Sequence, residues 1–123
     1  MKVAVIEGDG IGHEVIPPAR DAVGIIRPDI EFFDVEAGYG RWDRTGEAIT
    51  DDDITLLASA DAILFGAVTT PPAADYRSVI VRIRKELDLY ANVRPVWGTG
   101  FDIIVVRENT EGLYSGIEKI EQD

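Results

Sequence analysis

The sequence predicts an α/β fold, with a mainly parallel sheet and helices on both faces. The first observation is that short apolar runs, typical of buried strands, alternate with longer stretches of helical periodicity. Such alternation needs crossover connections, which place helices on the faces of parallel strands. The second is that 123 residues, 46% of them hydrophobic and 28% charged, have the balance of a globular domain with its own core.

The first two elements are a strand and a long helix. Residues 2–7 are an apolar run and are predicted to form a buried strand. Residues 11–26 repeat apolar side chains on one face of a helix. Pro17 and Pro18 lie inside that segment, and proline lacks the N–H that a helix uses. We therefore expect the helix to start late or to kink at the two prolines.

The middle of the chain predicts a second strand, a helix and a third strand. The second strand covers 30–37, and the glycines that flank Tyr39 predict a turn over 38–40. Thr50 is predicted to cap a helix that runs to about Ala60, because three aspartates follow it and favour the positive end of the helix dipole. The third strand covers 62–68.

The last part predicts a helix and two further strands. A basic and apolar helix is expected over 77–90 and a fourth strand over 91–96. Residues 97–100 are predicted to be a short connector, followed by a fifth strand over 102–109 and a hairpin-like tail over 110–120.

Composition excludes several classes of function. The net charge of −11 disfavours a nucleic-acid partner, because phosphates are bound by clusters of Lys and Arg. The sequence has no cysteine, which excludes disulfides and thiolate metal sites. No apolar run is long enough to span a bilayer, and no leader precedes the first strand, so we expect a soluble, cytoplasmic protein without a membrane partner.

The loop after the first strand resembles a dinucleotide-binding fingerprint only in part. Gly8, Gly10 and Gly12 are present, but His13 stands where G-x-G-x-x-G requires its third glycine. Asp9 adds a carboxylate where a pyrophosphate would lie. The Rossmann interpretation is therefore weak. His13 has no second histidine or cysteine beside it, which makes a metal site there a poor interpretation.

Three arginines carry more information. Arg84 lies in the predicted helix over 77–90, and Arg94 and Arg107 lie at or near the ends of two strands. Guanidinium groups match carboxylates in bidentate fashion, so this set indicates a pocket for a polycarboxylate. Pairing with the many local acids is an equally good explanation from the residues alone. Tyr114 follows Arg107 by seven residues and offers a hydroxyl that can donate a proton.

Five segments together resemble the isocitrate/isopropylmalate dehydrogenase family. They are EGDGIGHEVIP, TGEAITDDDI, ADAILFGAVTTP, YRSVIVRIRKELDLYANVRP and VRENTEGLYSGIE, and they extend from residue 2 to about 118. The resemblance implies an isopropylmalate-dehydrogenase-like α/β arrangement that is not a Rossmann fold. It also implies oxidation of a 3-substituted malate with NAD or NADP and Mg²⁺ or Mn²⁺, with loss of carbon dioxide.

The same resemblance implies roles for individual residues. Tyr114 matches the tyrosine that protonates the enol left after decarboxylation. The residues that match substrate-binding positions are Ser78, Arg84, Arg94 and Arg107. The residues that would lie near the cofactor are Ile11, Thr69 and Thr70.

The chain departs from the family in what it lacks. The family's catalytic lysine and metal-binding aspartates lie beyond this segment, and the usual excursion between the RP and VREN motifs is reduced to a glycine turn. We therefore expect a truncated, inactive fragment with no metal ligands of its own. Residues 1–97 would belong to the first domain, and 98–123 would open the second. Exposed sheet edges in such a fragment predict association, as a homodimer.

The resemblance implies that the start of the helix over 77–90 determines which substrate is bound. Ile80 and Val81 suit an apolar isopropyl group, whereas Arg77 and Ser78 suit a further carboxylate. We slightly favour 3-isopropylmalate, with isocitrate or homoisocitrate as the alternative. A non-catalytic carboxylate-binding module or a designed folding fragment is the remaining hypothesis.

Overall fold

The chain forms two compact units, Met1–Ile80 and Val81–Asp123. The computed structural model describes residues 1–72 and 75–115. Each unit has its own sheet. The expected domain limits, 1–97 and 98–123, stay a prediction about the longer family proteins.

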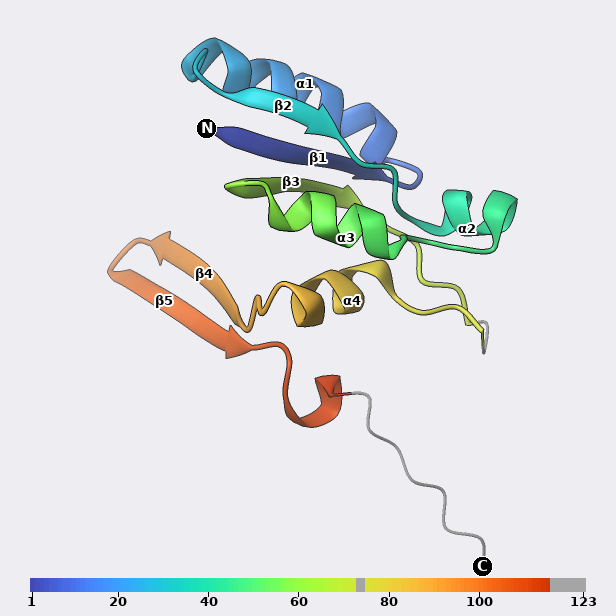
Figure 1. Ribbon diagram of the computed structural model, residues 1–123. Helices are drawn as coiled ribbons and strands as arrows, with labels where there is room; N and C mark the ends of the chain where they lie inside the picture. The colour runs from blue at the N-terminus through green and yellow to red at the C-terminus, as the bar shows by residue number, and fades with distance from the viewer. Residues whose placement is uncertain (73–74, 116–123) are drawn as a thin grey trace, which may run out of the picture. The chain divides into compact units, whose positions relative to one another are not determined.

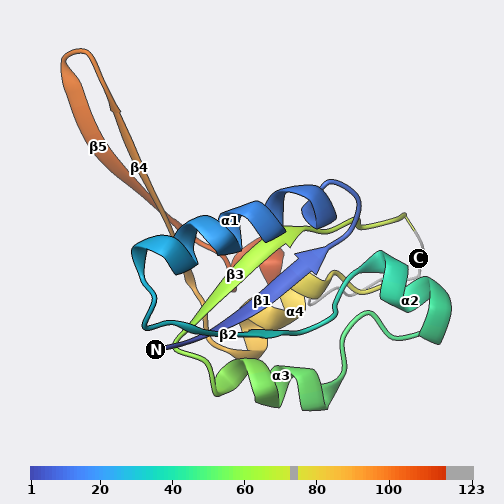
Figure 2. The ribbon, with the colours of Figure 1, turned by 90° about the horizontal axis from the view of Figure 1, so that it is seen from above.

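The first unit is built on a three-stranded parallel sheet. Its strands are β1 (Lys2–Gly8), β2 (Glu31–Asp34) and β3 (Ala62–Ala67), in the order β2-β1-β3. Helix α1 (Gly12–Ile26) lies on one face and α3 (Asp51–Ala58) on the other (Figures 1 and 2). The predicted parallel sheet with helices on both faces is confirmed for this unit.

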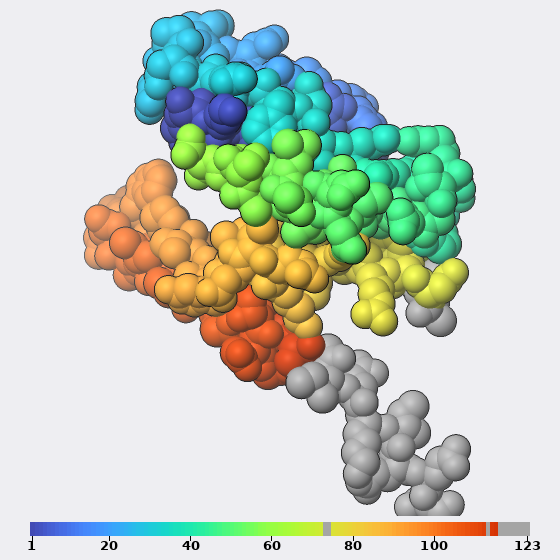
Figure 3. All heavy atoms as spheres, in the orientation of Figure 1, coloured from blue at the N-terminus to red at the C-terminus, as the bar shows by residue number. Residues whose placement is uncertain are grey.

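Burial of the central strand forms the core of the first unit. Four consecutive residues of β1, from Val3 to Ile6, are at most 7% exposed. Ile16 of α1 and Leu57 of α3 are also buried. Because both faces of β1 are covered, its side chains read as a continuous apolar run without alternation. Figure 3 shows the neighbouring segments closing over most of this strand.

Helix α1 begins at Gly12 and contains both prolines, so it does not start late. Pro17 and Pro18 occupy its second turn, on an exposed stretch. The carbonyls that lose an N–H partner there belong to His13 and Glu14, which are also exposed, so water can replace the missing donors.

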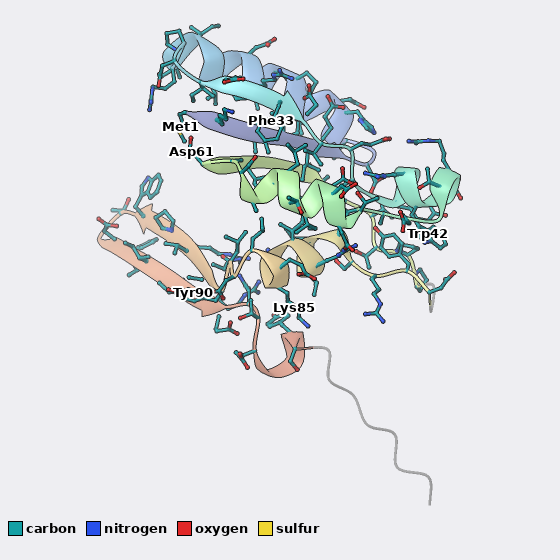
Figure 4. All side chains as sticks on the ribbon, in the orientation of Figure 1. Met1, Phe33, Trp42, Asp61, Lys85 and Tyr90 are labelled. Carbon is teal, nitrogen blue, oxygen red and sulfur yellow. The ribbon has the colours of Figure 1, made fainter. Side chains whose placement is uncertain are left out.

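The predicted turn over 38–40 is wrong, because Tyr39 begins a short helix, α2 (Tyr39–Thr45). The preceding strand, β2, covers Glu31–Asp34 and is shorter than the predicted 30–37. Trp42, labelled in Figure 4, stacks on Tyr39 at 5.7 Å and meets Tyr76 edge-on at 5.5 Å between ring centroids. These long-range ring contacts stabilise a helix that has no apolar periodicity of its own.

The predicted cap of α3 is confirmed in detail. The Thr50 hydroxyl accepts the Asp53 N–H at 3.2 Å, and the Asp53 carboxylate accepts the Thr50 N–H at 2.9 Å. This reciprocal capping box satisfies two donors that the helix end leaves open.

Helix α4 (Val79–Glu86) is shorter at both ends than the predicted segment 77–90. After it, Asp88 adopts a left-handed conformation with φ of 53°, and the Leu89 N–H bonds to the Arg84 carbonyl at 2.8 Å. That reversal ends the helix before the next strand.

The second unit contains an antiparallel hairpin. β4 (Ala91–Gly98) pairs with β5 (Phe101–Glu108), from Ala91 opposite Glu108 to Gly98 opposite Phe101. The fourth and fifth strands therefore do not join the parallel sheet, and the expected connector is a two-residue turn with Gly100 at φ +85°. A 3₁₀ turn, Gly112–Tyr114, follows; residues 116–120 of the expected tail lie outside the described residues.

The two faces of the hairpin differ in chemistry. Strand alternation and the register place Asn92, Arg94, Val105 and Arg107 on one face, which we call the arginine face. The other face, the apolar face, carries four side chains that are 58–74% exposed: Val93, Trp97, Ile104 and Val106. The arginine face also carries apolar side chains, which are 42–51% exposed: Val96, Phe101, Ile103 and Val105. Within the described residues, no helix is long and apolar enough to cross a bilayer.

Candidate functional site

In the first unit, the connection of the strands reverses direction between β1 and β3. The chain passes from β1 to β2 through α1, then returns past β1 to β3 through α2 and α3, on the other face (Figure 2). In open α/β sheets, ligands bind at such a reversal, outside the carboxyl ends of the strands. Ile11 follows β1, and Thr69 and Thr70 follow β3, so the sequence-predicted cofactor residues lie at this edge of the sheet.

The Asp9 carboxylate holds the segments at this edge together. One oxygen accepts the N–H groups of Tyr39 at 2.9 Å and Thr69 at 2.8 Å, and the other accepts the Gly40 N–H at 2.8 Å. The Asp9 N–H also donates to the Ala67 carbonyl at 2.6 Å. A single side chain therefore joins the loop after β1, the loop after β3 and the first turn of α2.

The pKa of Asp9 reflects these bonds. Partial burial would raise this pKa, but three backbone N–H donors and the nearby His13 lower it below its ordinary value. The carboxylate is thus ionised when the three segments are joined. In the sequence, Asp9 argues only against a bound pyrophosphate. The glycines on either side of it, Gly8 and Gly10, are the sequence signal for a tightly folded loop, and both have a positive φ in the structure.

Two glycines make room for this arrangement. A Cβ on Gly38 would lie 2.7 Å from both carboxylate oxygens of Asp9. A Cβ on Gly8, which has a φ of +80°, would lie 2.0 Å from the Ala67 carbonyl oxygen. Gly8 and Gly38 therefore serve close packing, and Gly10, with a φ of +54° and open space at its Cβ position, serves the backbone turn, so no pyrophosphate is needed to explain them.

The segment before α4 is anchored by Tyr76. Its ring is buried against Tyr39 and Trp42, with a 6.1 Å centroid distance to Tyr39. Its buried hydroxyl has no hydrogen-bond partner within residues 1–72 and 75–115, and burial together with the charge of Asp9 raises the pKa of this phenol. Ser78, a sequence-predicted substrate residue, is half-buried two positions after this anchor.

A cavity of about 320 Å³ lies at the ends of β1 and β2. Most charged side chains that line it already have a partner. His13 Nδ1 lies 2.8 Å from Glu7, Arg44 contacts Glu36, and backbone N–H groups hold Asp9. Arg41 and Asp34 pair with residues outside the lining, Asp53 at 2.6 Å and Arg20 at 2.8 Å. His13 is exposed in the first turn of α1.

In the second unit, Arg94 and Arg107 share the arginine face of the hairpin. Arg94 is opposite Val105, and Arg107 is opposite Asn92, so the two arginines are diagonal neighbours on adjacent strands. Both are exposed. Among the described residues, neither arginine forms an ion pair with a carboxylate.

Each of these arginines is bonded to an asparagine two residues away. Arg94 Nε donates to Asn92 Oδ1 at 2.8 Å, and Arg107 Nε donates to Asn109 Oδ1 at 3.1 Å. The Arg107 guanidinium also lies over the Tyr114 ring, 5.6 Å from its centroid. The structure therefore brings Arg107 and Tyr114 together. The sequence analysis missed both asparagines, although each stands two residues from its arginine.

The turn that returns Tyr114 toward Arg107 is organised by Glu108. Its carboxylate accepts the N–H groups of Thr110 at 2.7 Å and Glu111 at 2.8 Å, and also the Thr110 hydroxyl. The Thr110 hydroxyl makes the largest contribution that lowers the pKa of Glu108, and these backbone donors lower it further.

The third sequence-predicted arginine, Arg84, lies in α4 and is half-buried.

No metal centre accompanies these groups in residues 1–72 and 75–115. No three histidine, cysteine or acidic side chains there are placed to hold an ion. The divalent metal that the sequence resemblance implies has no fitting ligand set among them.

Comparison with known proteins places these features in context. The isocitrate/isopropylmalate dehydrogenase family model matches residues 2–123. An isocitrate/homoisocitrate dehydrogenase of Pyrococcus horikoshii is 49% identical over 118 residues, which cover 94% of this chain and 34% of the relative. A 3-isopropylmalate/3-methylmalate dehydrogenase of Methanocaldococcus jannaschii is 45% identical, covering 95% and 36%.

Solved structures show the same relationship. A β-decarboxylating dehydrogenase from Thermococcus kodakarensis superposes with a TM-score of 0.80 at 44% identity, covering 91% of this chain and 35% of that one. An isocitrate dehydrogenase from Methylococcus capsulatus gives a TM-score of 0.86 at 34% identity, covering 99% and 38%. The chain thus spans about a third of the length of the proteins it matches.

Proposed function

Because the chain belongs to the isocitrate/isopropylmalate dehydrogenase family, we propose that it supplies the acid-binding and proton-donating part of an NAD(P)-dependent oxidative decarboxylase. The observation that carries the proposal is the arginine face, where Arg94 and Arg107 have no carboxylate partner among the described residues and Tyr114 lies beneath Arg107. A 3-substituted malate offers carboxylates that match two guanidinium groups.

The proposed roles follow from the chemistry of the reaction. Arg94 and Arg107, with Arg84, hold the substrate carboxylates in register. NAD(P), when bound, would accept the hydride from the hydroxyl carbon. Loss of the β-carboxylate of the resulting keto acid as carbon dioxide would leave an enolate, and Tyr114 would donate the proton that this enolate needs at carbon.

The cofactor is proposed to lie at the edge of the first unit's sheet. Ile11 is 57% exposed and would give an apolar surface for a flat ring, and Thr69 and Thr70 are exposed in the loop after β3. Asp9 fixes the backbone under Thr69. NAD or NADP would supply the hydride acceptor. No step is assigned to a metal, since its ligands are not found among the described residues.

We propose 3-isopropylmalate as the substrate. The support is the half-buried apolar pair Ile80 and Val81 at the start of α4. Isocitrate or homoisocitrate is the second candidate, favoured by exposed Arg77 and by Ser78. Arg77→Glu should weaken binding of a tricarboxylate more than binding of 3-isopropylmalate. Equal losses, measured by calorimetry, would contradict this use of Arg77.

For the chain as it stands, we propose binding without turnover. The catalytic lysine and metal-binding aspartates that the family resemblance implies are not in these 123 residues. NADH formation with NAD, Mg²⁺ and each of the three acids tests this directly. Folded protein should bind an acid yet form no NADH. Turnover would show that the missing groups are present or replaced, and absence of acid binding would refute the proposed role of the arginines.

The apolar face of the hairpin is the proposed surface for self-association. Its four exposed side chains form a patch of the kind that soluble monomers rarely leave uncovered. A homodimer through this face would cover it while leaving the arginine face accessible. A cytoplasmic location is also proposed, supported by the chain's membership of this dehydrogenase family.

A further inference from the structure

We propose that Asn92 and Asn109 are positioning residues that hold the Nε groups of Arg94 and Arg107, so that each guanidinium presents its two Nη groups end-on to a carboxylate. The inference deepens the proposed function and rests on it. It adds the side-chain amides of Asn92 and Asn109 to the proposed acid site, and it specifies that the carboxylate approaches the Nη groups.

The two pairs repeat one arrangement on neighbouring strands. Asn92 precedes Arg94 by two residues on β4, and its Oδ1 accepts Arg94 Nε at 2.8 Å. Asn109 follows Arg107 by two residues at the end of β5, and its Oδ1 accepts Arg107 Nε at 3.1 Å. Because Asn92 is opposite Arg107, both pairs lie on the arginine face and continue one another across the ladder.

Asn109 is held firmly enough to act as a support. It is 4% exposed, and it is the buried polar residue among those that the structure describes. Its N–H donates to the Tyr90 carbonyl at 2.8 Å, which ties the end of β5 to the segment before β4. A buried amide without a partner would be costly, and the bond to Arg107 satisfies it.

Occupation of Nε changes how an arginine can bind an acid. A guanidinium has five N–H donors and can grip a carboxylate side-on, through Nε and one Nη, or end-on, through both Nη atoms. A bond from Nε to an asparagine removes the side-on mode. It also restrains a long exposed side chain before the ligand arrives, which reduces the entropy lost on binding.

The choice of an amide over a carboxylate supports a binding role. The chain has 23 acidic and 12 basic residues, so acidic partners for arginines are abundant. An acidic residue at either position would neutralise the guanidinium and compete with the ligand. An asparagine oxygen fixes the same Nε and leaves the positive charge available. The Tyr114 ring, 5.6 Å away, adds a second, uncharged contact to Arg107.

The arginine Nε–H signals in a ¹⁵N NMR spectrum of the full 123-residue chain test the clamp without any ligand. The wild type should show slowly exchanging signals for Arg94 and Arg107. Asn92→Ala should accelerate exchange at Arg94 alone, and Asn109→Ala or Asn109→Ser at Arg107 alone. The variants at residue 92 and at residue 109 are thus controls for each other. Asn109→Ser is the alternative if Asn109→Ala disturbs the turn, because serine keeps a polar side chain there that is shorter than asparagine.

Titration with 3-isopropylmalate and with isocitrate then tests the consequence. Each alanine variant should weaken binding about fivefold to tenfold, because the freed arginine side chain must be ordered when the acid binds. Asn92→Asp should keep Arg94 Nε protected yet weaken binding more than Asn92→Ala, because it adds a competing charge.

Two results would overturn the inference. Unchanged Nε–H exchange in the alanine variants would show that the amides do not hold the arginines. Equal acid affinity of the wild type and the alanine variants would show that the clamp has no role in binding. If the wild type binds neither acid, the proposed function fails, and the Nε–H spectra still decide whether the clamp exists.

Discussion

The two sheets of the molecule are stabilised in different ways. In β1 of the first unit, Val5 and Ile6 are at most 2% exposed, and helices cover both faces of the sheet. In β5 of the second unit, every residue is exposed. An isolated two-stranded hairpin is marginally stable in water, whereas a covered parallel sheet has a hydrophobic core. The proposed cofactor edge therefore lies on a sheet with a buried core, and the arginines proposed to bind an acid lie on a hairpin that needs a second surface.

Truncating one isoleucine in each sheet gives the largest expected contrast. Ile6→Ala should reduce the free energy of unfolding by about 2–5 kcal/mol, because it leaves a cavity in the core of the first unit. Ile104→Ala, at a side chain that is 66% exposed, should change it by less than about 0.5 kcal/mol. Urea unfolding followed by circular dichroism measures both. Similar losses would show that the hairpin is as well covered as β1.

Two glycines with nearly equal φ provide the next contrast. Gly8 and Gly100 have φ of +80° and +85°, but only Gly8 is crowded, by the Ala67 carbonyl. Gly100→Ala should cost about 1 kcal/mol of conformational strain. Gly8→Ala should cost about 2–3 kcal/mol, because strand or loop must also move. Equal destabilisation in urea would mean that close packing at Gly8 is unimportant.

Acid should weaken the first unit through Asp9 and Asp53. The pKa of each lies below the ordinary value of 3.8: burial would raise it, but backbone donors at Asp9, and Thr50 with Arg41 at Asp53, lower it. Such groups add stability that is complete above the unfolded-state pKa and is lost as the pH falls through the folded-state pKa. Unfolding free energy should therefore drop below about pH 4.

Asp9→Asn isolates one share of that effect. Asparagine cannot accept all three N–H bonds, so stability near neutral pH should fall by about 1–2 kcal/mol, and its acid dependence should become shallower. Asp102→Asn, which removes an exposed carboxylate of the hairpin, controls for the loss of one charge. If the free energy of unfolding of Asp9→Asn kept the same dependence on pH as the wild type, Asp9 would not contribute to the acid sensitivity.

Substitutions on the apolar face should change stability least, but they should change self-association. Ile104→Lys with Val106→Lys should abolish self-association seen by light scattering, because charges on that face oppose its burial. Stability of the first unit should change by less than about 0.5 kcal/mol. Persistent dimers in this variant would place the interface elsewhere. Lysines at Val105 and Ile103, on the arginine face, serve as the control pair.

Local signals in the sequence predicted most of the fold. The apolar runs gave β1 and β3 because burial on both faces requires them, and Thr50 followed by three aspartates gave the capped start of α3. Helix α2 was missed because Asp9 and the Tyr76 ring stabilise it from distant positions. The antiparallel pairing of β4 and β5 was missed because alternation of strands and helices does not determine which strands pair.

The candidate site was predictable in part for the same reason. The family motifs pointed to Arg94, Arg107 and Tyr114, but Arg94 lies in the middle of β4 and not at a strand end as predicted. Their asparagine partners were not identified, because an Arg–Asn bond depends on side-chain direction and on the register of the hairpin. Asp9 was misread because its three donors come from two other segments of the chain.

Hydrogen exchange with mass spectrometry at two protein concentrations tests the central contrast most directly. Peptides from β1 and β3 should be protected to the same degree at both concentrations. Peptides from β4 and β5 should exchange rapidly in dilute protein and become protected only as association covers the apolar face. Equal protection of both sheets in the most dilute sample would contradict the account, because the hairpin would then be stable without a second surface.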